Sequence, residues 1–228
     1  MARSRPGSAK PVATAPVTLA PVVLPDLVPA DRQTFGAAEP VEALVFAGVD
    51  LSGLVHDDAE LLDCRLTGCR LDGARLRRGR LVSCVLSELH ATTLDVADSS
   101  WRDVLLSDCR IGALTAHGLQ LRSVTVRGGN LDFVNLRGAD LDRVRFEGCR
   151  IGELDLGSAQ VHDVRLDGTE VDRLVLGGAS CADVHLEQGV VGVVEGVPGL
   201  RGVTVSRSQL DALAPALAAH VGLAVAAD

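Results

Sequence analysis

The chain has 228 residues, which is enough for one domain with a sizeable core. Its formal net charge of −8 argues against a general nucleic-acid-binding protein, because such proteins present a strongly basic face. Hydrophobic residues make up 47% of the chain but aromatic residues only 2%, so the core must consist of Leu, Val, Ala and Cys. Such small, uniform residues suit a narrow repeated interior better than an irregular globule.

The composition also argues against export or membrane insertion. No run of about 18 apolar residues is present, so no membrane-spanning segment is expected. Prolines interrupt every apolar run that follows Arg3, Arg5 and Lys10, which argues against a signal peptide. Because six cysteines occur without an export signal, we expect reduced thiols and a cytoplasmic protein.

Residues 1–40 are interpreted as a Pro- and Ala-rich N-terminal tail. Seven of the nine prolines lie in it: Pro6, Pro11, Pro16, Pro21, Pro25, Pro29 and Pro40. Proline at this spacing blocks helices and sheet ladders, so residues 1 to about 20 are predicted to be extended or disordered. The more apolar stretch from Val22 to Phe35 either lies against the repeated region that follows or has no role in the folded body.

A five-residue repeat occupies the middle of the chain, from Phe46 to Val191, without one slip. Of thirty positions at this spacing, twenty-six hold a large apolar residue, and a second inward residue, usually smaller, lies two positions before each. A period of five is neither the 3.6 of a helix nor the 2.0 of an ordinary strand. It predicts a coil with flat sides about five residues long that stacks by parallel backbone pairing. We expect residues 41–205 to form this body.

The repeat resembles the pentapeptide-repeat family, whose motif is a small residue, then Asp or Asn, then Leu and two variable residues. Ala139-Asp140-Leu141-Asp142-Arg143 matches this motif fully, and Gly129-Asn130-Leu131 matches it closely. The resemblance implies an all-β fold, a right-handed quadrilateral β-helix with four pentapeptides per coil. Thirty pentapeptides divided by four then make seven and a half coils.

Side-chain volumes agree with a four-sided coil, in which residues ten apart face each other. Ala91 then lies opposite Trp101, so the smallest inward residue faces the largest. From Val124 onward the second inward position alternates between large and small residues. This alternation predicts a cross-section with two distinct kinds of side.

Residues 206–228 are predicted to form a C-terminal helix and tail. Ser208 is the expected N-cap, Pro215 is expected to kink or shorten the helix, and Gly222 to stop it. A final strand is expected at residues 223–225. The apolar face of the helix consists of Leu210, Leu213, Leu217 and Val221. This face either caps the open end of the β-helix or joins two copies as a homodimer, and the two roles are compatible.

No constellation of residues points to an enzyme, a metal site or a cofactor. The six cysteines occupy inward positions, where core packing accounts for them, and they lack the paired spacing of a zinc site: Cys64, Cys69, Cys84, Cys109, Cys149 and Cys181. Cys64 and Cys84 should stack, but a reducing compartment argues against a disulfide. Because a filled interior leaves no pocket, we expect no catalytic residues, no metal and no cofactor.

The outer surface is therefore where function is expected, and columns of residues twenty apart define two features there. The first is an acidic patch formed by Asp142, Glu147, Asp163, Asp167, Asp183 and Glu187. Residues 129–196 hold 13 acidic and 6 basic residues, a net −7, against 12 and 10 in residues 41–128. The second is a basic stripe formed by Arg70, Arg110 and Arg150. Stacked like charges destabilise a fold, so each feature is either tolerated as solvated surface or kept for a partner.

The resemblance also suggests a function. Some pentapeptide-repeat proteins bind DNA gyrase or topoisomerase IV with a rod that is similar to DNA in shape and charge, and they inhibit the enzyme or protect it. A non-enzymatic, DNA-mimicking binder of these enzymes is therefore one hypothesis for this chain. The alternative is a structural or protein-interaction scaffold with an unidentified partner. Neither hypothesis involves direct nucleic-acid binding or a membrane.

Overall fold

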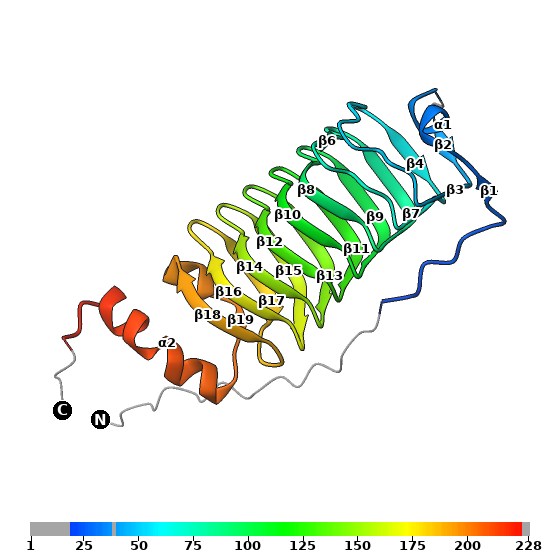
Figure 1. The fold of residues 1–228 in the computed structure, drawn as a ribbon. Helices are drawn as coiled ribbons and strands as arrows, with labels where there is room; N and C mark the ends of the chain where they lie inside the picture. Colours follow the sequence, from blue (N-terminus) through cyan, green and yellow to red (C-terminus); the bar gives the residue numbers. More distant parts are fainter. Residues whose placement is uncertain (1–18, 38–39, 225–228) are drawn as a thin grey trace.

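A computed structural model, which describes residues 19–37 and 40–224, shows the chain wound into a four-sided rod (Figure 1). Each coil takes twenty residues, and the rod has about nine coils. The predicted quadrilateral β-helix is therefore confirmed. Seven and a half coils was too low an estimate. Two strands outside the unbroken repeat, β1 (Val28–Pro29) and β19 (Val203–Thr204), continue the stack at its two ends.

Two parallel sheets form three of the four sides, and turns form the fourth. The strands of the larger sheet bend around one corner and so cover two sides: β1, β2 (Val41–Glu42), β3 (Leu44–Ala47), β4 (Glu60–Leu62), β5 (Arg65–Thr67), β7 (Arg80–Ser87), β9 (Ser100–Ser107), β11 (Gln120–Arg127), β13 (Asp140–Glu147), β15 (Gln160–Asp167), β17 (Ser180–His185) and β19. The smaller sheet consists of β6 (Ala74–Arg75), β8 (His90–Asp95), β10 (Arg110–Thr115), β12 (Asn130–Asn135), β14 (Arg150–Asp155), β16 (Glu170–Val175) and β18 (Val190–Glu195).

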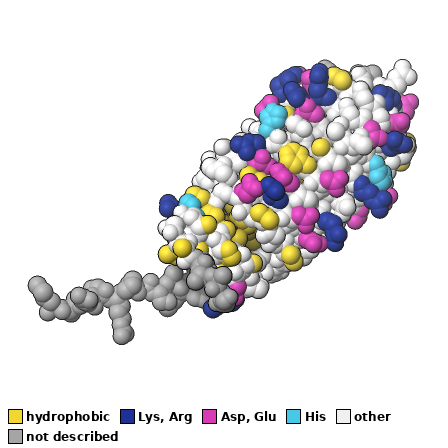
Figure 2. Space-filling view, turned by 60° about the vertical axis from the view of Figure 1, so that its left-hand side comes forward, with side chains coloured by type: hydrophobic (Ala, Val, Ile, Leu, Met, Phe, Trp, Pro, Cys, Tyr) yellow, Lys and Arg dark blue, Asp and Glu magenta, His cyan; other side chains and the backbone are white. Residues whose placement is uncertain are grey.

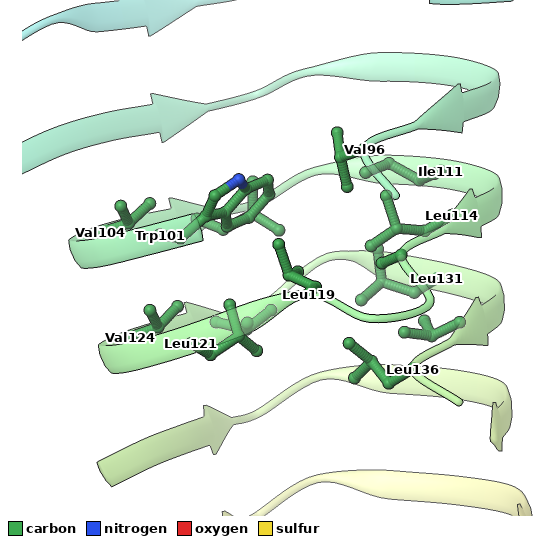
Figure 3. Close-up of a cluster of buried hydrophobic side chains, with 14 of the residues drawn as sticks. Val96, Trp101, Val104, Ile111, Leu114, Leu119, Leu121, Val124, Leu131 and Leu136 are labelled. Carbon is green, nitrogen blue, oxygen red and sulfur yellow. The ribbon is translucent and has the colours of Figure 1, made fainter. Parts of the chain in front are cut away.

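The interior is filled by the apolar residues of the repeat. Neighbouring coils pair at a spacing of twenty residues, for example Leu121 beside Leu141 and Ile111 beside Leu131. Figure 3 shows Trp101, Ile111 and Leu131 pointing into the space between the sides. Two internal gaps have volumes of about 30 and 10 Å³ and are lined by apolar side chains, so neither has room for a ligand larger than a water molecule.

The second inward position often carries a small polar group that hydrogen-bonds to the backbone. A thiol or hydroxyl donates to the carbonyl oxygen 23 residues earlier in seven cases: Cys64, Cys69, Cys84, Ser99, Cys109, Cys149 and Thr169. These donor–acceptor distances range from 2.9 Å at Thr169 to 3.8 Å at Cys109. Cysteine therefore fills volume and also occupies a backbone acceptor, and all six cysteines are free.

The N-terminal end of the rod is closed by α1 (Arg32–Ala37). Its Phe35 is fully buried, with its ring 5.2 Å from that of Phe46 and 6.0 Å from that of His56. Of the two alternatives for the apolar stretch, the structure therefore favours packing against the first coil. The stretch predicted to be extended or disordered lies, up to residue 18, outside the described residues.

The C-terminal end carries a short 3-10 helix, η1 (Val197–Leu200), and then α2 (Arg207–His220). The N-cap is Ser206 and not Ser208, because the Ser206 hydroxyl accepts from the Gln209 amide while the Gln209 side chain accepts from Ser206. Of the two effects expected of Pro215, a kink or a shorter helix, the shortening is wrong, since α2 continues to His220. Leu223 and Ala224 form no strand, and the rest of the strand expected there lies outside the described residues.

Candidate functional site

The acidic patch lies on the outer side of the larger sheet. Asp142 and Glu147 belong to β13, Asp163 and Asp167 to β15, and Asp183 to β17, with Glu187 just beyond it. Glu147 stacks directly on Asp167, as their spacing of twenty residues predicts. Asp163 and Asp183 occupy the corner where the strands bend, with φ of 49° and 55°. Aspartate tolerates this left-handed backbone better than most residues, which suits it to the corner.

Arginine or histidine side chains lie against most carboxylates of this patch. Glu147 pairs with Arg127 at 2.8 Å, and Asp163 pairs with Arg145 at 2.8 Å. Asp183 and Glu187 lie 2.9 and 3.0 Å from the two ring nitrogens of His185. Asp142 is 3.5 Å from Arg143, and of the six patch carboxylates Asp167 alone has no ion pair to a described residue. The local field is therefore weaker than six isolated carboxylates would produce, although the excess of acidic residues remains.

The ion pairs follow a rule that columns of like residues did not reveal. Most arginine–carboxylate pairs join residues 18 or 20 apart, because such residues lie on neighbouring coils. Examples at 18 residues are Arg77 with Asp95 and Arg137 with Asp155. The same geometry joins Arg122 to Asp140, and this hydrogen bond holds the pKa of the Asp140 carboxyl below its usual range. A search of the sequence for opposite charges at these two spacings would have found these pairs.

Two buried arginines and a buried histidine form a column that sequence reasoning missed. Arg145, Arg165 and His185 stack in register on β13, β15 and β17, and their exposed fractions are 3%, 5% and 8%. They occupy outward positions, where a side chain is ordinarily exposed, as Arg65 is in the same column. The carboxylates of the acidic patch flank this column on both sides. The patch therefore consists of two rows of carboxylates with a row of buried basic side chains between them.

The basic stripe runs along the outer side of the smaller sheet. Arg70, His90, Arg110, Asn130 and Arg150 stack in one column. Arg70 donates to Asp72 at 2.8 Å, and this bond, together with two from Thr92, lowers the pKa of Asp72 to about 2. Arg150 pairs with Glu170 at 3.0 Å. Along this stripe Arg110 alone has no ion pair to a described residue, so the stripe is also largely neutralised.

The apolar face of α2 lies partly against the core and partly in solvent. Leu213 is buried and Leu217 is half-buried, and both pack against the core. Leu210 and Val221 are exposed, at 45% and 67%. Gln209, which sequence reasoning missed, donates from Nε2 to the carbonyl oxygens of Leu186 and Gly189 at the last coil. The capping sequence from Ser206 to Gln209 is the signal that could have identified it.

Figure 2 shows acidic and basic side chains interspersed along the rod, with hydrophobic side chains gathered towards the end that carries α2. The exposed large hydrophobic residues at that end are Val190, Val193, Leu210, Val221 and Leu223. Across residues 19–37 and 40–224, no group of three or more His, Cys, Asp or Glu side chains is placed to hold a metal ion. In the same residues, no helix has the length and apolar character needed to cross a membrane.

Stacked coils, a filled interior and charges paired between coils define a parallel β-solenoid. The chain belongs to the pentapeptide-repeat family: the family model described as pentapeptide repeats matches eight copies, over residues 45–81, 120–157 and 130–168. No curated protein matches the chain in sequence.

Solved structures with detectable likeness include pentapeptide-repeat proteins. Full-length QnrB1, a plasmid-mediated fluoroquinolone resistance protein, is 17% identical, with 83% of this chain and 94% of that chain covered and a TM-score of 0.34. HetL, a pentapeptide-repeat protein involved in heterocyst differentiation regulation in the cyanobacterium Nostoc, is 16% identical, with 76% and 94% covered and a TM-score of 0.30. Likeness at this level carries no information about the function of this chain.

Proposed function

We propose that this chain is a non-enzymatic rod that binds a basic protein surface with its C-terminal half. The observation that supports this function is the excess of 13 acidic over 6 basic residues between 129 and 196. Five of the six basic residues there already pair with carboxylates of the rod, so the remaining acidic charge is available to a partner. A patch of one sign favours and speeds the association with a surface of the opposite sign.

The shape of the rod favours a macromolecular partner over a small molecule. The internal gaps are too small for a ligand, and two depressions on the described surface, of about 350 and 360 Å³, are widely open to solvent and do not enclose a ligand. The long outer surface of the rod offers contact area instead of a pocket. Binding through such a surface needs no catalytic residue, metal or cofactor.

The DNA-binding surface of DNA gyrase or topoisomerase IV is one basic surface that fits this proposal, and a cytoplasmic location is then required. Against it stands the pairing of three of the six patch carboxylates with arginines, which makes the rod a weaker imitation of DNA than its composition suggests. An interaction scaffold with a different basic partner is the alternative that this observation favours.

If DNA gyrase is the partner, the purified protein should inhibit gyrase supercoiling, or rescue it from a quinolone, at low micromolar concentration. Replacing the unpaired carboxylates of the acidic half with Asp132→Asn, Asp167→Asn and Asp172→Asn should weaken the effect about tenfold. The matched control carries Asp98→Asn, Asp103→Asn and Asp108→Asn in the other half and should behave as the unmodified chain. If the unmodified protein has no effect in either assay, neither topoisomerase is the partner. Specific capture of another basic protein, lost in the first variant only, would then support the scaffold.

We also propose that the C-terminal end joins two copies. The supporting observation is the group of exposed apolar residues there, since monomers seldom leave such groups uncovered. Light scattering should give twice the monomer mass, and Leu210→Glu with Val221→Glu should halve it. Val23→Glu, at a site that is 81% exposed near the other end, is the control. A monomer mass for the unmodified chain at all concentrations would contradict this assembly.

A further inference from the structure

Arg165 is a buried guanidinium that has no counter-ion among the residues that the structure describes. It points outward from β15 and is 5% exposed, yet it forms neither a hydrogen bond nor an ion pair with any of those residues. Removing a charge from water is costly, so a buried arginine ordinarily lies against a carboxylate. The position of Arg165 therefore requires an anionic neighbour.

The preceding coil shows where that neighbour should be. Arg145 lies beside Arg165 in the sheet, and it donates to the carbonyl oxygen of Asp163 at 2.6 Å and to its carboxylate at 2.8 Å. Asp163 is 18 residues ahead of Arg145, and the residue 18 ahead of Arg165 is Asp183. The two aspartates occupy equivalent corners, with φ of 49° and 55°. Arg165 thus has a carboxylate in the equivalent position but does not pair with it.

His185 holds that carboxylate instead. Its Nε2 lies 2.9 Å from Oδ1 of Asp183, and its Nδ1 lies 3.0 Å from Oε1 of Glu187. An ionised carboxylate only accepts hydrogen bonds, and both nitrogens of a histidine ring donate only when the ring carries two protons. This arrangement therefore belongs to the positively charged ring, which holds both carboxylates and leaves none for Arg165.

The other groups around the ring leave Arg165 as the one alternative partner for Asp183. The charged side chains come from β15, β17 and the turn after β17: Asp163, Arg165, Asp167, Asp183 and Glu187. On the opposite side, β19 places Thr204 in register with His185 and contains no titratable residue. Oε2 of Glu187 is also buried without a hydrogen-bond partner in the described part of the chain.

We propose that His185 is a proton-controlled switch that determines which side chain pairs with Asp183. The charged ring holds both Asp183 and Glu187. When Nε2 releases its proton to solvent, Nδ1–H still donates to Glu187, but Nε2 becomes an acceptor that faces the carboxylate of Asp183. Two acceptors repel each other, so Asp183 turns to Arg165 and pairs with it as Asp163 pairs with Arg145.

The exchange changes the charge of the acidic patch. With the ring charged, Arg165 and His185 balance Asp183 and Glu187, and the four groups have no net charge. Once the ring is neutral, the same four groups carry a net charge of −1. A basic partner should therefore bind more tightly at the higher pH. That consequence rests on the proposed function, whereas the exchange of ion pairs requires no partner.

NMR spectra of the ¹⁵N-labelled full-length protein test the exchange directly. The ring signals of His185, assigned by their loss in His185→Gln, should show two protonated nitrogens at about pH 5 and only Nδ1 protonated at about pH 9. The Nε–H signal of Arg165 should shift with the same midpoint, because its partner changes. Arg145 is the internal control: it keeps Asp163 throughout, so its Nε–H signal should not follow that midpoint.

Two matched variants make the result specific. Asp183→Asn should abolish the shift of Arg165, and asparagine tolerates the left-handed backbone of this corner, so the fold is retained. Asp167→Asn removes a neighbouring carboxylate that has no ion pair to a described residue, and it should leave the shift unchanged. An Arg165 signal that does not follow His185, or one that still follows it in Asp183→Asn, would overturn the switch. A coupled shift in a protein that captures no basic partner would retain the switch and remove the proposed function.

Discussion

Raising the pH from 8 to 10 is expected to lower the free energy of unfolding by about 4 kcal/mol. The cause is the burial of thiols inside the coil. Desolvation raises the pKa of Cys84 to about 12 and the pKa values of Cys109 and Cys149 to about 11, from an ordinary value of 9.0. Each of these side chains is at most 3% exposed, so solvent does not relieve the desolvation.

The direction follows from comparing the two states. Below pH 9 these thiols are protonated in both the folded and the unfolded chain, so their contribution is fully present. As the pH rises from 9 towards 11, they ionise in the unfolded chain but stay neutral in the folded one. Stability is lost over that interval, by about 1 kcal/mol per thiol for each pH unit. The pKa values of Cys64 and Cys69 are also raised by burial and add to the loss.

The composition leaves few other groups that could contribute to the pH dependence. The chain has no tyrosine and one lysine, so few side chains other than cysteine titrate between pH 8 and 10. Urea unfolding followed by circular dichroism at the two pH values gives the change. A Cys84→Ala, Cys109→Ala, Cys149→Ala variant should lose most of the pH dependence, since alanine occupies equivalent positions at Ala139 and Ala159. An unchanged pH dependence in that variant would assign the effect to other groups.

Replacing Gly129 with alanine is expected to destabilise the protein by at least about 3 kcal/mol. Gly129 has a φ of 79°, where a Cβ is strained, and it packs against the preceding coil. An added Cβ would overlap the carbonyl oxygen of Cys109 and lie 2.7 Å from its backbone nitrogen. Both atoms belong to the backbone of the neighbouring coil, so no side chain can move aside to relieve the overlap.

Gly148→Ala is the matched control. Gly148 has a similar positive φ of 62°, but nothing lies within 4 Å of the added Cβ. It should therefore show only the conformational penalty of about 1 kcal/mol. Comparison of the two urea midpoints separates backbone strain from contact between coils. Equal losses of stability in the two variants would show that the close approach of the coils at Gly129 does not contribute to the loss.

The core follows from the repeat with little ambiguity. A large residue every fifth position, as at Leu141 and Ile151, can be buried by a chain only if it turns a corner every five residues. The predicted inward columns are accordingly buried along most of the rod. The ends were harder to predict, because a cap is defined by a few local contacts and not by a period. The sequence therefore predicted Ser208 as the N-cap where the structure has Ser206, and the role of Gln209 was missed.

The charged surface could be predicted only in part. The excess of acidic residues after residue 129 is a property of the sequence, and so is the alignment of Glu147 with Asp167. The partner of each charge depends instead on how far a long side chain reaches across the gap between coils. Arg145 meets Asp163 because the next coil brings its corner within 2.8 Å. Nothing in the sequence indicates that Arg145 and Arg165 are buried, because Arg65 occupies the same column and is exposed.

The sequence by itself determined the coil, because the period of five sets which side chains turn inward and the stacking of coils then follows from backbone pairing. It also determined the sign of the charge on each half of the rod. Only the tertiary structure decided which carboxylates are neutralised and which outward cations are buried. Only the structure, too, brought Phe35 against the first coil. These features depend on contacts between residues that are close in space. The period of five does not determine which residues make those contacts.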